Sequence, residues 1–109
     1  MRRGDIVTVA APGDYGKPRP AVIIQGDVLN HANPRSTIVA LMTSTLRDAP
    51  LLRLTVEPRP DNGLHKVSQV QTHRLVTVRT EKISDPVGRL SDQEIVQLNR
   101  LLALAIGLA

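Results

Sequence analysis

The chain passes from loop to sheet in one stretch, Lys17-Pro18-Arg19-Pro20-Ala21-Val22-Ile23-Ile24. Its two prolines push the residues before them, Lys17 and Arg19, toward extended backbone. The unbroken apolar run after them predicts a strand over 21–25 that is buried on both faces. Arg19 is therefore expected at the start of that strand, where a planar guanidinium can meet a phosphate with a fork of donors. An Arg-Pro pair taken alone is more often a solvated strand end.

Strand-like segments lie on both sides of this stretch. β-branched and apolar runs predict strands over 6–10 and 37–42, and alternation over 52–56 predicts a half-buried antiparallel strand. Glycine and proline mark a loop over 11–18. The remaining expected elements are a helical turn around 27–30, a turn over 58–63, strands over 66–72 and 75–78, and a helical turn over 80–83.

The C-terminal segment has the clearest helical pattern. Ser91 and Glu94 have the spacing of a capping box, and Gly107 is placed to end the helix. The expected apolar face comprises Ile95, Leu98, Leu102, Ala105 and Ile106, widened by Leu101 and Leu104. The predicted fold is mainly β: one domain over 1–109, a small barrel or strongly bent antiparallel sheet with a C-terminal helix.

Composition narrows the possible functions. The net charge of +4 suits a polyanionic partner such as RNA, DNA or an acidic peptide. Absence of cysteine excludes disulfides, thiolate catalysis and cysteine zinc sites, and it fits a reducing cytoplasm. No apolar run reaches membrane-spanning length, so we expect a soluble cytoplasmic protein. Tyr15 is the sole aromatic residue, so nucleic-acid binding would depend mainly on cationic contacts to phosphates.

Two candidate groups end neighbouring strands. Arg19 precedes the second strand, and Thr43 and Ser44 end the third. Sequence-neighbouring strands usually pair, so these groups are expected to lie together at one sheet end. A cation and a hydroxyl in one cleft can bind a phosphoryl group and stabilise its added charge. From spacing alone, ordinary turn chemistry is the more common role for such hydroxyls.

The three histidines offer an alternative acid–base pair, as in a two-histidine ribonuclease. His31 and His65 fall in predicted turns, and His73 ends a predicted strand. None has a neighbour at metal-ligand spacing, so we interpret them as solvated surface residues. The sequence also has no P-loop, dinucleotide fingerprint or paired-carboxylate motif.

Six short pieces appear in a characteristic order and strand–helix context. They are Arg3-Gly4-Asp5-Ile6-Val7, Arg19-Pro20-Ala21-Val22-Ile23, Leu41-Met42-Thr43-Ser44, Ser68-Gln69-Val70, Gly88-Arg89-Leu90-Ser91 and Ile106-Gly107-Leu108. Through them, nearly the whole chain resembles the MazF/PemK family of bacterial toxin endoribonucleases. One departure is His73-Arg74-Leu75-Val76, where many members carry a Glu-Gln-Ile-Arg-like run that helps to shape substrate preference.

The resemblance implies an SH3-like or CcdB-like barrel, usually a two-fold homodimer. It implies cofactor-free, metal-independent cleavage of single-stranded RNA, often mRNA, at short motifs, leaving 2′,3′-cyclic phosphate and 5′-hydroxyl ends. The catalytic residues would be Arg19 and Thr43, beneath a loop over 11–18. The substrate-binding residues would be Tyr15, Lys17, Ser44, Ser68 and Gln69. An antitoxin with an acidic, partly apolar tail would occupy the same groove.

Two other functions are compatible with this fold. Gyrase-poison relatives use a C-terminal tryptophan, whereas this chain has no tryptophan and ends Gly107-Leu108-Ala109. A non-catalytic member would only bind an antitoxin or RNA, and the presence of both Arg19 and Thr43 argues against it.

Overall fold

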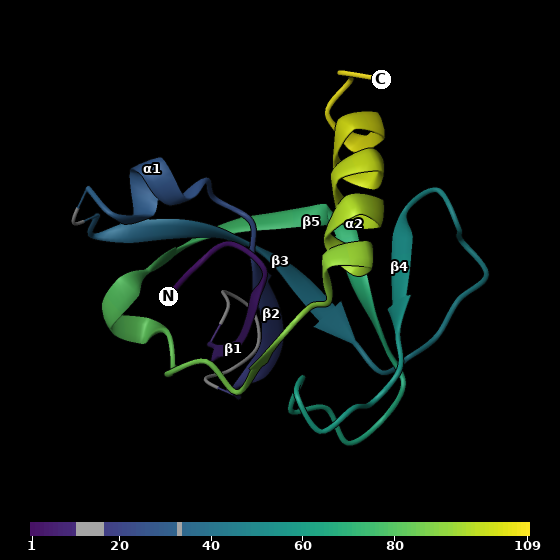
Figure 1. Cartoon of the computed structure of the whole chain (residues 1–109), viewed down its shortest axis with the longest axis horizontal. Helices are drawn as coiled ribbons and strands as arrows, with labels where there is room; N and C mark the ends of the chain where they lie inside the picture. Colours follow the sequence, from purple (N-terminus) through teal and green to yellow (C-terminus); the bar gives the residue numbers. More distant parts are fainter. Residues whose placement is uncertain (11–16, 33) are drawn as a thin grey trace.

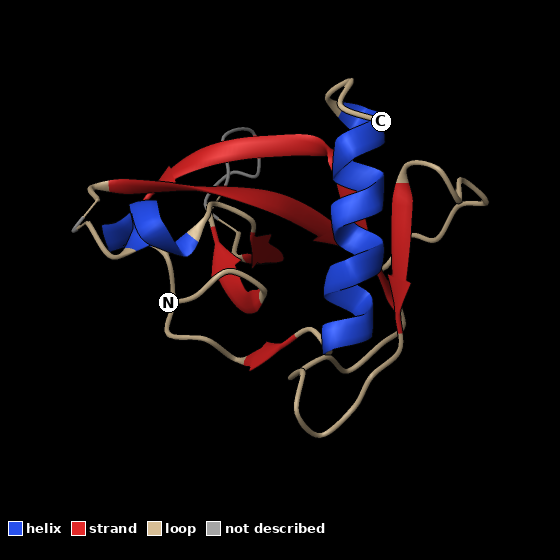
Figure 2. Ribbon diagram, turned by 45° about the horizontal axis from the view of Figure 1, so that its top comes forward, coloured by secondary structure: helices blue, strands red, loops and turns tan. Residues whose placement is uncertain are grey.

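Six strands form one curled antiparallel sheet, and a long C-terminal helix packs across it (Figures 1 and 2). The structure, a computed structural model, describes residues 1–10, 17–32 and 34–109. The sheet order is β4-β5-β3-β2-β1-β6. The elements are β1 (Asp5–Val9), β2 (Arg19–Ile23), α1 (Asp27–Asn30), β3 (Ser36–Thr43), β4 (Arg53–Val56), β5 (Ser68–Arg79), the 3₁₀ turn η1 (Thr80–Lys82), β6 (Gly88–Arg89) and α2 (Asp92–Ala105).

The stretch that begins with Lys17 forms β2 as predicted. This strand starts at Arg19, and Ala21, Val22 and Ile23 have no exposed surface, which confirms burial on both faces. β2 lies between β1 and β3, so its position in the sheet interior explains the unbroken apolar run. The helical turns expected near 27–30 and 80–83 are present as α1 and η1. Of the loop expected over 11–18, residues 11–16 lie outside the described residues.

The two strands predicted over 66–72 and 75–78 are one continuous strand, β5, so the predicted break was wrong. Ala40 of β3 pairs with Leu75, whereas Met42 pairs with Val70, so two steps along β3 correspond to five along β5. The three extra residues form an irregularity that leaves the polar pair His73 and Arg74 exposed. The polar interruption therefore bends the strand instead of ending it.

Strand β6 was not predicted either. It has only two residues, Gly88 and Arg89, which pair with Ile6 and Asp5 of β1. A segment this short has no period that sequence analysis can detect, and its extended form depends on the pairing with β1.

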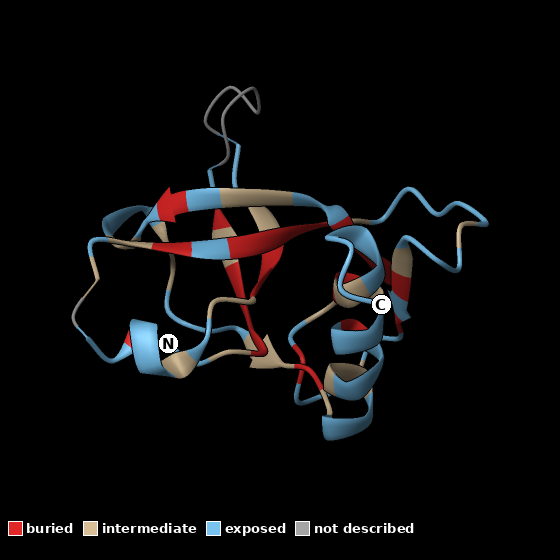
Figure 3. Ribbon diagram, turned by 90° about the horizontal axis from the view of Figure 1, so that it is seen from above, coloured by how far each residue is buried: buried red, intermediate tan, exposed pale blue. Residues whose placement is uncertain are grey.

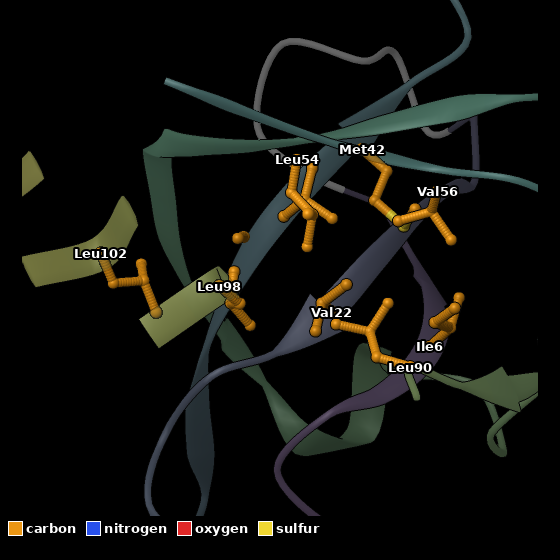
Figure 4. Packing of buried hydrophobic residues seen from close by; sticks show 10 residues of the cluster. Ile6, Val22, Met42, Leu54, Val56, Leu90, Leu98 and Leu102 are labelled. Carbon is orange, nitrogen blue, oxygen red and sulfur yellow. The ribbon is translucent and has the colours of Figure 1, made fainter. Parts of the chain in front are cut away.

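Two apolar clusters occupy opposite faces of the sheet because strand side chains alternate. The cluster beneath α2 comprises Ile6, Val22, Ala40, Met42, Leu54, Val56, Val70, Leu90, Leu98 and Leu102 (Figure 4). The other comprises Val7, Val9, Ala21, Ile23, Val39, Leu41 and Val78. Buried residues follow the strands, whereas the outer side of α2 is exposed (Figure 3).

Helix α2 contributes less of its apolar face to the core than predicted. Leu98 and Leu102 are buried, and Ile95 and Leu101 pack at the margin of the core. Ala105 and Ile106 are exposed because the last turn of the helix extends beyond β5 (Figure 1). Gly107 ends the helix with φ +81°, as its position predicted. No helix among the described residues is long and apolar enough to span a membrane.

The first turn of α2 is fixed by the predicted capping box and by an ion pair. Ser91 Oγ accepts from Glu94 N at 3.1 Å, and Glu94 Oε1 accepts from Ser91 N at 2.8 Å. The Glu94 carboxylate also accepts two hydrogen bonds from Arg59, at 2.8 and 2.9 Å. Burial alone would raise the pKa of Glu94, but the hydrogen bonds from Arg59 and Ser91 outweigh it and lower that pKa.

The fold should consequently lose stability in acid through Glu94. Because the pKa of this carboxyl is below its ordinary value in the folded state, its stabilisation is full above about pH 4.5 and disappears as the pH falls through the folded pKa. Thermal unfolding of the wild type and of Arg59→Met, measured from about pH 6 to about pH 3, should show a smaller acid-induced decrease for the variant. Arg79→Met is the control, because the Arg79–Glu81 pair is exposed. If the stability of the wild type and of Arg59→Met had the same pH dependence, the hydrogen bonds from Arg59 would not be what lowers the pKa of Glu94.

Candidate functional site

Arg19 lies at the sheet end where β2 begins, with its side chain directed across β3. Its Nη2 donates to the Met42 carbonyl at 3.0 Å and to Gln71 Oε1 at 3.4 Å. Ala21 pairs with Leu41, so the same antiparallel register extended by two positions sets Arg19 opposite Thr43. The structure therefore brings together the two groups that the sequence placed at neighbouring strand ends.

Thr43 is the last residue of β3, and its hydroxyl has a local structural task. Its Oγ1 accepts from Thr45 N at 3.1 Å, which turns the chain out of the sheet. A hydroxyl that accepts one hydrogen bond still has its own hydrogen to donate. The Thr43 hydroxyl can therefore stabilise the turn by accepting from Thr45 N and at the same time donate to a ligand. Ser44 follows it and is exposed.

Gln69 pairs directly with Thr43 across β3 and β5. Its side chain is buried and fully engaged: Oε1 accepts from Arg47 N and from Arg53 Nη1, each at 3.0 Å. Its Nε2 donates to the Arg47 carbonyl at 3.0 Å and to Thr55 Oγ1 at 3.2 Å. Gln69 therefore holds the segment between β3 and β4 against the sheet, immediately beside Thr43.

The other expected substrate contacts differ in accessibility. Lys17 is exposed on the approach to Arg19. Ser68 is buried, and its Oγ donates to the Lys66 carbonyl at 3.0 Å. Tyr15 lies outside the described residues. The substrate-binding roles of all these residues, and the catalytic roles of Arg19 and Thr43, stay predictions.

The histidines fit the surface role expected of them, since His31, His65 and His73 are all exposed. Among residues 1–10, 17–32 and 34–109, no group of three or more His, Cys, Asp or Glu side chains is arranged to hold a metal ion.

A pocket of about 470 Å³ lies next to Gln69, between the segment before β4 and helix α2. Arg47, Arg53 and Arg100 line it together with one acid, Asp48, so three positive charges face one negative charge. This pocket was not predicted, because its arginines come from a loop, a strand and a helix far apart in the chain. Gln71 was not predicted either, although Gln69 and Gln71 have the two-residue spacing of one strand face.

The sequence also matches a known protein family over nearly its whole length. The model of the PemK-like, MazF-like toxin of type II toxin–antitoxin systems matches residues 2–106. The chain belongs to this family. Among its relatives, the probable endoribonuclease MazF of Mycolicibacterium smegmatis is 44% identical over 110 residues, covering 100% of this chain and 99% of the relative. The endoribonuclease MazF9 of Mycobacterium tuberculosis is 29% identical, covering 99% and 98%. The resemblance stated from the sequence is thereby confirmed.

Solved structures confirm the fold. A mycobacterial endoribonuclease in complex with its cognate antitoxin superposes with a TM-score of 0.81 at 20% identity, covering 100% of this chain and 97% of the other. The Mycobacterium tuberculosis toxin MazF-mt6 also gives 0.81, at 22% identity, covering 96% and 98%. At these identities the likeness concerns the fold alone, and it supports the predicted small bent sheet with a C-terminal helix.

Proposed function

We propose that this chain is the toxin of a type II toxin–antitoxin pair and cleaves single-stranded RNA, including mRNA, at short sequence motifs without a metal or cofactor. The observation that carries the proposal is the placement of the Arg19 guanidinium, bound to the Met42 carbonyl, beside Thr43 at the end of β3. A cation and a hydroxyl at one sheet end form a site for a tetrahedral anion. The chain belongs to the toxin family, and its 44% identical relative is described as a probable endoribonuclease. Both facts support an RNA phosphate as that anion.

The reaction needs an attack, a leaving group and charge stabilisation. The ribose 2′-oxygen attacks the adjacent phosphorus in line and loses its proton. The bond from phosphorus to the 5′-oxygen breaks, and that oxygen gains a proton, which leaves a 2′,3′-cyclic phosphate and a 5′-hydroxyl. Arg19 stabilises the charge on the phosphoryl and leaving oxygens, and Thr43 donates to a non-bridging oxygen. A guanidinium keeps its proton far above neutral pH, so Arg19 is a donor and not the general base.

The surroundings of the site suit a flexible polyanion. Lys17 and Ser44 are exposed beside Arg19 and Thr43, where they can contact phosphate or ribose oxygens. Gln69 shapes the wall of the site beside Thr43, Ser68 precedes it on β5, and Tyr15 is the one side chain able to stack on a base. The arginine-lined pocket adjoining Gln69 extends the positive surface, so RNA binding should weaken as salt is raised.

We further propose that the chain acts in the cytoplasm as a single domain and forms a two-fold homodimer. Large apolar side chains are exposed at the end of α2, on the residues that follow it and on the segment before β4; they are Leu46, Leu51, Leu52, Leu104, Ile106 and Leu108. Apolar surface of this kind is typical of a contact between chains. Sedimentation velocity should give twice the chain mass of 11.9 kDa, and a monomer at all concentrations would refute the dimer.

An antitoxin whose tail is acidic and partly apolar is the proposed protein partner. Such a tail would compete with RNA for the Arg19–Thr43 groove, because its carboxylates can take the place of phosphates. The mycobacterial endoribonuclease of the same fold was solved with its cognate antitoxin, which supports this kind of partner.

The proposed activity is tested with a long natural RNA incubated with the purified protein in EDTA. New ends are mapped across the RNA, and their chemistry is determined. Cleavage at recurrent short motifs, with cyclic phosphate and 5′-hydroxyl ends, is the expected result, and Arg19→Ala is the matched inactive protein. An RNA that stays intact with the wild type, or is cut equally by the variant, would refute the proposal.

Thr43 provides a second, graded test. Thr43→Val keeps the side-chain shape but removes the hydroxyl, so kcat should fall about 10²-fold with little change in KM. Thr43→Ser keeps the hydroxyl, which can still donate to the phosphate and accept from Thr45 N, so this variant should retain most of the activity. Single-turnover cleavage of a short RNA measures both variants. Valine and serine variants with equal rates would exclude a hydroxyl contribution.

A further inference from the structure

Gln71 is a buried amide that contacts the proposed catalytic arginine. Only 5% of the residue is exposed, and its Oε1 accepts from Arg19 Nη2 at 3.4 Å. The Met42 carbonyl accepts from the same nitrogen at 3.0 Å. Both hydrogens of Nη2 are thus directed at protein oxygens, one from the backbone of β3 and one from a side chain of β5.

The contact crosses an intervening strand. In the sheet order, β3 lies between β5 and β2, so Gln71 and Arg19 are two strand spacings apart, about 10 Å between their backbones. Only long side chains on one face of a curled sheet can meet over that distance. Gln71 is also the first residue beyond Val70, where the register of β5 against β3 shifts. Irregularities of this kind re-aim side chains near functional sites.

The strand is anchored where Gln71 leaves the regular ladder. The next residue, Thr72, donates to the Leu52 carbonyl from its backbone N at 3.0 Å and from Oγ1 at 2.7 Å. Gln71 itself pairs with Arg53 of β4. Its backbone is therefore held on the β4 side while its side chain reaches toward β2, and it can fix the position of the guanidinium.

The chemistry of the acceptor is as important as its position. A carboxylate at this place would bind the guanidinium more strongly, but it would also compensate the positive charge that a phosphate must meet. An amide oxygen and a backbone carbonyl orient Nη2 and leave the net charge of Arg19 unchanged. Among the described residues, Gln71 Nε2 donates no hydrogen bond, so the side chain of Gln71 is engaged by its contact with Arg19.

We propose that Gln71 is a positioning residue that, together with the Met42 carbonyl, fixes the Arg19 guanidinium for transition-state binding through two uncharged acceptors. This inference rests on the proposed function of Arg19. It assigns a role to a residue that the sequence motifs did not single out.

Two substitutions separate orientation from charge. Gln71→Leu keeps the approximate volume and removes the acceptor, so kcat should fall about 10-fold while KM changes less than about twofold. Gln71→Glu is isosteric and keeps an acceptor, so the fold should be retained, but kcat at neutral pH should fall at least as far because the carboxylate adds a negative charge beside Arg19. Thr37→Val is the control, since it removes the buried hydrogen bond from Thr37 Oγ1 to Asn30 Oδ1, which involves neither Arg19 nor the part of β5 that carries Gln71. It should lower stability and leave kcat unchanged.

A spectroscopic measurement tests the same contact independently of activity. In protein labelled with ¹⁵N-arginine, rotation about the Cζ–Nη2 bond of Arg19 should be slow in the wild type and in Thr37→Val, and faster in Gln71→Leu. Unchanged rotation in Gln71→Leu, or full kcat in both Gln71 variants, would overturn the inference. If the wild type cleaves no RNA, or Arg19→Ala is fully active, the proposed function fails, and the rotation rates still decide whether Gln71 holds Arg19.

Discussion

Arg19→Ala should reduce RNA cleavage by about 10³-fold or more while the protein stays folded. The loss follows from position: the guanidinium lies beside Thr43, where charge would develop on the phosphoryl oxygens. Arg19 is only half-buried at the first position of β2, so its truncation opens no large cavity in either apolar cluster. When both are measured on the same preparations, the cleavage rate should therefore fall while the thermal unfolding temperature changes little.

Arg19→Lys distinguishes the geometry of the side chain from its charge. Lysine keeps the positive charge but has a single nitrogen instead of a planar fork, so the atom that binds the Met42 and Gln71 oxygens would also have to bind the phosphate. The expected loss is about 10²-fold, intermediate between wild type and alanine. Arg35→Ala is the matched control, because it removes an equal charge from an exposed position outside the site. If lysine restored full activity, simple charge would suffice and the orienting contacts would have no catalytic part.

The proximity of Arg19 and Thr43 was predictable because it depends on short-range facts. Each residue ends a strand that its local sequence defines, and strands adjacent in sequence usually pair. The start of α2 was predictable for the same reason, since Ser91 and Glu94 meet within one helical turn.

The rest of the site depends on contacts between distant segments. Gln71 contacts Arg19 across β3, next to a register shift within β5, and hydrophobic alternation contains no signal for such a shift. The arginine-lined pocket likewise requires the loop at 47–50, β4 and α2 to converge. The exposed end of α2 was misjudged because periodicity shows which helix face is apolar, and not how far the sheet extends beneath it.

Gly88→Ala should destabilise the fold by about 3 kcal/mol or more, because this position has no room for a methyl group. A Cβ on Gly88 would overlap the backbone of Asn62, namely its Cα, carbonyl carbon and carbonyl oxygen. Relief requires movement of one of two backbone segments, since no flexible side chain lies in the way. On one side Gly88 is paired with Ile6 of β1, in the middle of an apolar cluster.

On the other side, the backbone of Asn62 is held in place by hydrogen bonds of its side chain. Asn62 is fully buried, its Nδ2 donates to the Glu57 carbonyl at 2.7 Å, and its Oδ1 accepts from Arg59 N at 3.0 Å and Leu64 N at 3.1 Å. The same turn is tied to α2 through Arg59 and Glu94, so displacing it would strain the start of the helix.

Denaturant unfolding of Gly88→Ala measures the cost, with Gly26→Ala as the control. A Cβ on Gly26 would meet no heavy atom within 4 Å, so that variant should stay within about 0.5 kcal/mol of wild type. A Gly88→Ala protein with wild-type stability would mean that β6 or the Asn62 turn yields easily. The close packing of these two segments would then be incidental to the fold, and the absence of a side chain at position 88 would need another explanation.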